Sequence, residues 1–315
     1  MSISWGDLFT QGTLIDFSVH LWRAKLQLTA KDLGIDETDD VQKAIRFGSH
    51  RLAPSEAFEA INSQVRGYQT DIQEHSLAFP VLQGVRYVPD SEVKTLQTKL
   101  DLRVRQFNIE VEKFLDQYDD MMREMIPVIE QALTEAAKTP EAAQAALSRV
   151  IQNYPSREKV AEKFELEWNF FTISMPVSSE ASKMAKDANS QVQKVMSSML
   201  EELRAELSEK VGSLLSLAQK VKDGNSRDKD GFGSRSKESA INVLNKVDRL
   251  NILGDPVLSE QTKKLRSILE SESIDATEVV RDLDTIKSNL EVDIQSARDM
   301  AEKKLTGLGN RKIMM

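Results

Sequence analysis

Three histidines, His20, His50 and His75, are the side chains of this sequence best suited to proton transfer or metal binding near neutral pH. His20 falls on the polar face of a predicted strand, His50 in a Gly-Ser turn and His75 near a predicted helix end. None belongs to the Glu-x-x-His pairs of a carboxylate-bridged di-iron bundle. We therefore expect surface or capping roles for all three.

Other chemical motifs are missing from the sequence. It has no cysteine, which excludes disulfides, thiolate zinc sites and cysteine nucleophiles. Neither GxxxxGK[ST] nor a helix-opening GxGxxG is present, so no common nucleotide-phosphate loop is expected. The fragment 228–231, DKDG, is similar to part of a calcium loop, but that register places Lys237 where a bidentate glutamate is needed. We expect no catalytic residue, no cofactor and no metal; an enzyme of unfamiliar type is the alternative.

One short basic run is a candidate for partner binding. The segment Arg46-Phe47-Gly48-Ser49-His50-Arg51 falls in a predicted turn, where its side chains could hold a phosphate or a carboxylate. The candidate partner-binding residues are Arg46, His50 and Arg51. The same side chains could instead pair with acidic neighbours in the chain, namely Asp36, Glu37, Asp39 and Asp40.

Composition restricts the classes of partner and the location. The net charge is −8, whereas a duplex-binding surface is expected to carry a basic excess, so we expect no nucleic-acid partner. No apolar run approaches the roughly 20 residues of a membrane span, so we expect no membrane partner. Residues 1–10 lack the basic and apolar regions of a secretory signal. The predicted location is the cytoplasm.

Two long amphipathic stripes dominate the rest of the sequence. Their apolar residues recur every three or four positions, as in heptad-based helices. The first stripe predicts one helix through Met125, kinked at Pro127 where a backbone donor is lost. Its members are Val93, Leu96, Leu100, Val104, Phe107, Val111, Phe114, Tyr118, Met121 and Met125. The second comprises Met184, Ala188, Val192, Val195, Met199, Leu203, Leu207, Val211, Leu214, Ala218 and Val221. Together they predict a long antiparallel coiled-coil helical hairpin.

Three short segments predict strands. Residues 13–22 alternate between apolar and polar side chains, and residues 84–88 form a shorter candidate. Residues 166–175 are apolar on both faces, which predicts a central strand. We expect the three to form one small sheet. Shorter helices are predicted over 39–46, 54–78, 140–153, 239–251, 256–270 and 275–305.

The predicted fold class is therefore mainly α, with a small β-containing head (α+β) beside the hairpin and a C-terminal helical module. Residues 1–222 are expected to hold the hairpin and head and to fold alone. Residues 223–237 are rich in glycine and charge and are predicted to be a flexible linker. Residues 238–315 are predicted to form a three-helix module.

Several stretches resemble an uncharacterised bacterial and phage family of domains of unknown function. They are the block from Leu14 through Trp22 to Gly34, Phe47-Gly48-Ser49-His50-Arg51-Leu52, the turn Gly84-Val85-Arg86-Tyr87-Val88-Pro89, and Tyr154-Pro155 followed by Phe164, Trp168 and Pro176. The resemblance covers about residues 12–215. Members of that family occur in phage and mobile-element genomes, often near genes for cobalt-chelatase-like AAA+ ATPases and von Willebrand A-domain proteins.

The resemblance implies a role beside a remodelling motor. We expect a non-enzymatic helical adaptor or scaffold whose protein partner is an AAA+ ATPase or a von Willebrand A-domain protein. One alternative is a self-assembling phage structural or assembly protein, in which the stripes pair between chains as a homo-oligomer. A helical pore-former is a third hypothesis, although the strand segments offer no long apolar tongue.

Overall fold

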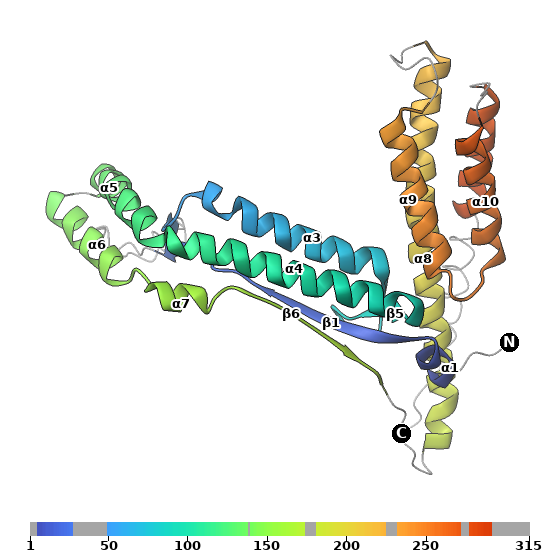
Figure 1. Cartoon of the computed structure of the whole chain (residues 1–315), viewed down its shortest axis with the longest axis horizontal. Coiled ribbons are helices and arrows are strands. Elements are labelled where there is room, and N and C mark those ends of the chain that lie inside the picture. The colour runs from blue at the N-terminus through green and yellow to red at the C-terminus, as the bar shows by residue number, and fades with distance from the viewer. Residues whose placement is uncertain are drawn as a thin grey trace, which may run out of the picture. The chain divides into compact units, whose positions relative to one another are not determined.

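The computed structural model describes residues 5–27, 49–137, 139–173, 181–224, 232–271 and 277–291. The chain is mostly helical and has one small four-stranded sheet (Figure 1). Its contacts divide the described residues into two compact units. Unit 1 holds the residues up to Asp16, Ile72–Gln97 and those from Asn169 onward, and unit 2 holds Phe17–Asp71 and Thr98–Trp168.

The elements with defined bounds follow one another along the chain as follows. They are α1 (Trp5–Thr10), β1 (Gly12–His20), β2 (Lys25–Gln27), β3 (Ser49–Arg51), the 3-10 helix η2 (Ser55–Phe58), α3 (Glu59–His75), β4 (Leu77–Ala78), β5 (Arg86–Pro89), α4 (Asp90–Asp116), α5 (Tyr118–Ala136), α6 (Pro140–Gln152), α7 (Arg157–Ala161), β6 (Glu165–Phe171), α8 (Ala181–Lys222), α9 (Ser234–Leu250) and α10 (Pro256–Glu270). A further helix spans 277–291.

The sheet has the strand order β4-β5-β1-β6. In β1, Leu14 lies opposite Tyr87 of β5, and both side chains are fully buried. The three predicted strands are thus confirmed as parts of one sheet. The prediction that 166–175 is a central strand is wrong, because β6 forms an edge of the sheet. The short strand β4 and the two-stranded ribbon of β2 and β3 were not predicted.

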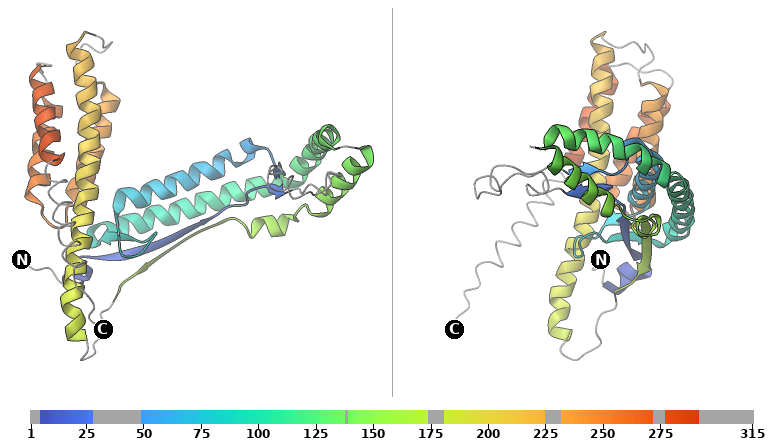
Figure 2. Two further views of the ribbon diagram at one scale, coloured as in Figure 1. Left: turned by 180° about the vertical axis from the view of Figure 1, so that it is seen from behind. Right: turned by 90° about the vertical axis from the view of Figure 1, so that its left-hand side faces the viewer.

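In unit 1, the stripe of α8 is buried against the helices that follow it. Residues from Val195 to Ala218 form one apolar cluster with residues of α9, α10 and 277–291. The α8 and α9 helices are antiparallel, since Glu206 pairs with Lys246 and Lys210 pairs with Ser239 (Figure 2). The segment 225–231 lies outside the described residues.

The α9 helix begins within the segment predicted as a linker. Ser234 is its first residue, and Phe232 just before it is only 6% exposed and belongs to the same apolar cluster. Glycine and charge dominate this segment in the sequence, so its single aromatic residue gave no signal of burial.

In unit 2, the stripe of α4 is buried in an aromatic cluster. Phe107 and Phe114 are 0% and 4% exposed, and their rings lie 6.5 Å and 5.5 Å from Phe164. After α4 in the sequence, α5 and α6 pack against each other through a second apolar cluster, which includes Leu133 and Val150. A periodic stripe predicts a buried face but not the partner that covers it. The α8 stripe is buried by contacts within unit 1, where its long antiparallel neighbour is α9, whereas Phe107 and Phe114 of the first stripe are buried within unit 2.

The first stripe is not one continuous helix. The α4 helix ends at Asp116 and α5 begins at Tyr118, with Gln117 between them at φ −95° and ψ −2°. Pro127 lies inside α5. The predicted single helix through Met125 is therefore wrong. The Tyr118 hydroxyl donates to the carbonyl of Pro155 at 2.6 Å, and such tertiary contacts override local helical periodicity.

Most of the shorter predicted helices are present. The α10 helix matches 256–270, and α3, α6 and α9 correspond to the predictions in their regions. Thr139 caps α6, because its hydroxyl accepts a hydrogen bond from the amide of Ala142. The predicted helix 39–46 and the end of 275–305 lie outside the described residues. No helix of the described ranges combines the length and apolar character needed to cross a membrane.

Candidate functional site

A cavity of about 300 Å³ in unit 2 lies where β1 gives way to β2 and meets the start of α3. Backbone and side chains from both sides of this junction line it: Leu21, Trp22, Arg23, Ala24, Lys25, Ala53, Ser55, Phe58 and Asn62. We call this cavity the ribbon pocket, because β2 pairs with β3 as a two-stranded antiparallel ribbon beside it.

The apolar wall of the ribbon pocket is aromatic. The Trp22 ring lies 6.1 Å from Phe58 and 6.1 Å from Phe114, and 5.7 Å from Tyr118. Burial raises the pKa of Tyr118, so its hydroxyl stays protonated and continues to donate to the carbonyl of Pro155. Aromatic pairs at these separations add stabilisation beyond their buried area. The wall is therefore supported by aromatic contacts of its own.

The backbone of the pocket is held in an uncommon conformation at Ala24. Its φ of 48° makes it the one non-glycine residue with positive φ among those described, and its side chain is buried at 3% exposure. The Ala24 carbonyl accepts a hydrogen bond of 2.7 Å from the amide of Leu52. The Tyr154 hydroxyl in turn donates to the Leu52 carbonyl. Residues outside the common φ/ψ regions persist where surrounding contacts over-determine them, and they are concentrated at binding sites.

Two cationic residues line the pocket. Arg23 and Lys25 flank Ala24 and are exposed. In the ribbon, Lys25 lies directly opposite Arg51, and Leu26 lies opposite His50. Within the part of the chain that the structure describes, neither Arg23 nor Lys25 takes part in an ion pair.

The sequence-predicted candidates map onto this site only in part. His50 and Arg51 belong to β3, beside the pocket, whereas Arg46 lies outside the described residues. Sequence reasoning missed Arg23 and Lys25 as functional candidates. Their only signal was their place in the stretch that resembles the family, because neither alternation nor charge distinguishes them.

A second polar cluster lies in unit 1 around a buried histidine. His75 Nδ1 lies 2.5 Å from Glu92 Oε2, and both side chains are almost fully buried. The same oxygen forms an ion pair with Arg249 Nε at 3.2 Å. The expected surface position is therefore wrong for His75, which is 4% exposed at the end of α3. His20, in β1, is exposed as expected.

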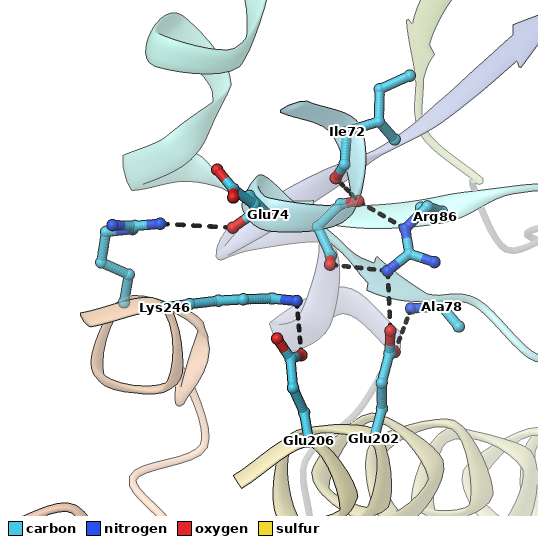
Figure 3. Close-up of polar contacts among 9 residues, drawn as sticks. Ile72, Glu74, Ala78, Arg86, Glu202, Glu206 and Lys246 are labelled. Atoms are coloured by element: carbon cyan, nitrogen blue, oxygen red, sulfur yellow. Dashed lines mark hydrogen bonds and ion pairs between the residues drawn. The ribbon is translucent and has the colours of Figure 1, made fainter. Parts of the chain in front are cut away.

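Of two neighbouring ion pairs in unit 1, one joins the sheet to α8 and the other joins α8 to α9 (Figure 3). Arg86 contacts Glu202 at 2.8 Å, and the second carboxylate oxygen of Glu202 accepts the amide of Ala78 at 2.6 Å. Lys246 contacts Glu206 at 2.6 Å. Each of these two carboxylates has a cationic partner, so the arrangement serves packing.

The chemistry of the two clusters differs. Among the described residues, no set of three or more histidine, aspartate or glutamate side chains could hold a metal ion. The ribbon pocket offers cations, aromatic faces and one hydroxyl, that of Ser55. Such a set can bind an apolar group next to an anion.

Within the described residues, these features define a mostly helical protein with a small antiparallel sheet and a cation-rimmed aromatic pocket. The family model described as a protein of unknown function, DUF3150, matches residues 10–271, and the chain belongs to this family. The match confirms the resemblance to a family of unknown function. It also extends beyond the expected end near residue 215, so α9 and α10 are part of the family's domain. No curated protein and no solved structure matches the chain.

Proposed function

We propose that this protein is a non-enzymatic helical adaptor that uses the ribbon pocket to hold a protein partner. The observation that carries the proposal is the pocket itself, which combines a fixed aromatic wall with the exposed cations Arg23 and Lys25. Aromatic anchors beside arginine are typical of the energetic centre of protein interfaces.

The helical parts suit a scaffold. In unit 1, α8 alone contributes 42 residues and packs antiparallel to α9 through its apolar stripe. Long paired helices give a stiff support for a docking site. The proposed setting is the cytoplasm, in agreement with the absence of cysteine.

The proposed partner is an AAA+ ATPase or a von Willebrand A-domain protein of a remodelling machine of phage or mobile-element origin. Its support is that genes of family members often lie near genes for such proteins, which is an association and not a structural observation. The identity of the partner rests on gene neighbourhood, and the location of the docking site rests on the geometry of the ribbon pocket. Either claim can therefore be wrong while the other holds.

Affinity purification from the native host tests the adaptor. The tagged chain is captured and the proteins that accompany it are identified by mass spectrometry, with a tagged protein of similar size and charge as the control. Recovery of an AAA+ ATPase or a von Willebrand A-domain protein above the control supports the proposal. Recovery of the chain alone, or with particle components, contradicts it.

One observation favours the alternative of a self-assembling phage structural or assembly protein. On α4, Leu102 and Ile109 are seven residues apart and are 48% and 49% exposed, which places two apolar side chains on one face of the helix. Light scattering coupled to size exclusion decides between the two readings. A stable homo-oligomer dissociated by Leu102→Glu and Ile109→Glu supports self-assembly, and a monomer supports the adaptor.

A further inference from the structure

We propose that the ribbon pocket binds an acidic protein segment by enclosing one bulky apolar side chain while the surrounding cations hold its carboxylates. The inference rests on the proposed adaptor function and names the chemistry of its partner. Its three supports are the size of the pocket, the aromatic wall, and the placement of the charges.

The pocket is large enough to take one bulky side chain of a partner. At about 300 Å³ it lies at the lower end of the range for sites that enclose a whole small molecule, roughly 300–1,000 Å³. The rings of Trp22 and Phe58 form the wall, and the aromatic cluster behind them fixes their positions. A phenylalanine or leucine side chain would bury its surface there at little cost in reorganisation.

Two exposed cations stand next to this wall. Arg23 and Lys25 both line the ribbon pocket, one on each side of Ala24. A carboxylate bound near them would be attracted by both charges, and arginine can hold it with two parallel hydrogen bonds.

The net charge of the rest of the chain also affects which anionic ligand can bind. The whole protein carries a net charge of −8, so an acidic segment is repelled in general and attracted only where cations gather. A nucleic acid would need a longer track of phosphate contacts to overcome the same repulsion. The local chemistry therefore favours an acidic peptide over a nucleic acid.

Fluorescence anisotropy of the full-length protein tests the inference. The probe is a fluorescein-labelled peptide with one phenylalanine flanked by glutamates on each side. Two matched probes replace the phenylalanine with alanine or the glutamates with lysines, and a labelled single-stranded oligonucleotide of equal length represents nucleic acids. We expect the acidic phenylalanine peptide to bind, and both matched probes to bind at least about tenfold more weakly.

Charge reversal locates the binding. The double variant Arg23→Glu, Lys25→Glu should weaken binding of the acidic peptide at least about tenfold. The control double variant, Arg235→Glu with Lys263→Glu, changes the net charge equally at exposed positions of α9 and α10. It should leave binding within about twofold. Circular dichroism and melting temperature show whether each variant is folded, and the milder Lys25→Gln replaces a variant that is not.

Several results overturn the inference. These are no binding of the acidic peptide, equal loss in the two double variants, indifference to the phenylalanine, or tighter binding of the oligonucleotide. Binding that occurs only after Asp36, Glu37, Asp39 and Asp40 are replaced by their amides also overturns it, because the chain's own acids would then be the occupants. If a partner is still recovered from the host by the Arg23→Glu, Lys25→Glu variant, the pocket assignment fails while the adaptor function stands.

Discussion

Arg86 on β5 and Glu202 on α8 form an ion pair of 2.8 Å whose side chains are only 16% and 29% exposed (Figure 3). The other oxygen of Glu202 accepts the backbone amide of Ala78 at 2.6 Å. Ala78 belongs to β4, which is an edge of the sheet. One carboxylate thus neutralises a half-buried arginine and satisfies an edge-strand donor, which protects that edge from pairing with another strand.

The first prediction concerns this carboxylate. Glu202→Ala should lower the free energy of unfolding by about 1–3 kcal/mol, because Arg86 and the Ala78 amide both lose their acceptor. Urea denaturation followed by circular dichroism measures the change. Glu209→Ala is the matched control, because Glu209 is an exposed glutamate on the same helix. Equal stability of the two variants would contradict a role for Glu202 in fastening β4 and β5 to α8.

The second prediction concerns Asp71 in unit 2, which accepts hydrogen bonds from Arg103 and Lys99 at 2.8 Å and 3.1 Å. Burial alone would raise the pKa of Asp71, but these hydrogen bonds and charges outweigh it and lower the pKa below its ordinary value. A lowered folded-state pKa contributes stability that is complete above the unfolded-state pKa, about 4, and is lost as the pH falls through the folded-state pKa.

The Asp71→Asn variant tests this direction of the pH dependence of stability. It should be less stable than the natural protein by about 1–2 kcal/mol at pH 7, and the difference should shrink as the pH falls below about 4. Urea denaturation at several pH values gives both curves. Asp101→Asn is the control, because Asp101 is exposed on α4. A stability difference that stays constant from neutral to acid pH would show that Asp71 contributes through packing and not through its charge.

Sequence patterns predicted the elements of this fold better than their partners. The strands at β1, β5 and β6 were recognisable because alternation marks the buried face of a strand, and Pro256 and Glu270 bounded α10 as expected. The α4 and α8 stripes were equally clear, yet the stripes pack within different units. Periodicity records that a face is buried, whereas the choice of partner depends on contacts distant in sequence.

The candidate site was harder to predict than the fold. His50 and Arg51 were proposed from their local charge, and the structure places them opposite Leu26 and Lys25. The pairing that gathers these cations is set by the ribbon register. The positive φ of Ala24 carries no sequence signal, since alanine is not typical of that conformation.

The third prediction tests the aromatic cluster of unit 2. Phe114→Asp should lower the free energy of unfolding by more than about 3 kcal/mol, because Phe114 is 4% exposed and a carboxylate there has no partner. Calorimetry or urea denaturation measures the loss. Ile109→Asp, on the same helix but 49% exposed, should change stability by less than about 1 kcal/mol. A Phe114→Asp protein with the melting temperature of the natural chain would contradict the burial of this face.

The fourth prediction concerns which C-terminal truncations leave a folded protein. The sequence alone led us to expect that residues 1–222 fold independently, but the contacts of α8 point to a different outcome. Leu203, Leu207, Val211 and Leu214 are at most 1% exposed because α9, α10 and 277–291 cover them. Removing these helices would expose a long apolar face, and faces of this kind lead to aggregation in the absence of a partner.

We therefore expect the 1–222 fragment to be aggregated or to lack a cooperative unfolding transition. A fragment ending at residue 291, which retains the described helices that cover α8, should unfold cooperatively like the full chain. Size exclusion and thermal unfolding of the two fragments, prepared in parallel, make the comparison. A soluble, monomeric and cooperatively folding 1–222 fragment would show that the C-terminal helices are a separate module, and that their contacts with α8 are not required for the fold.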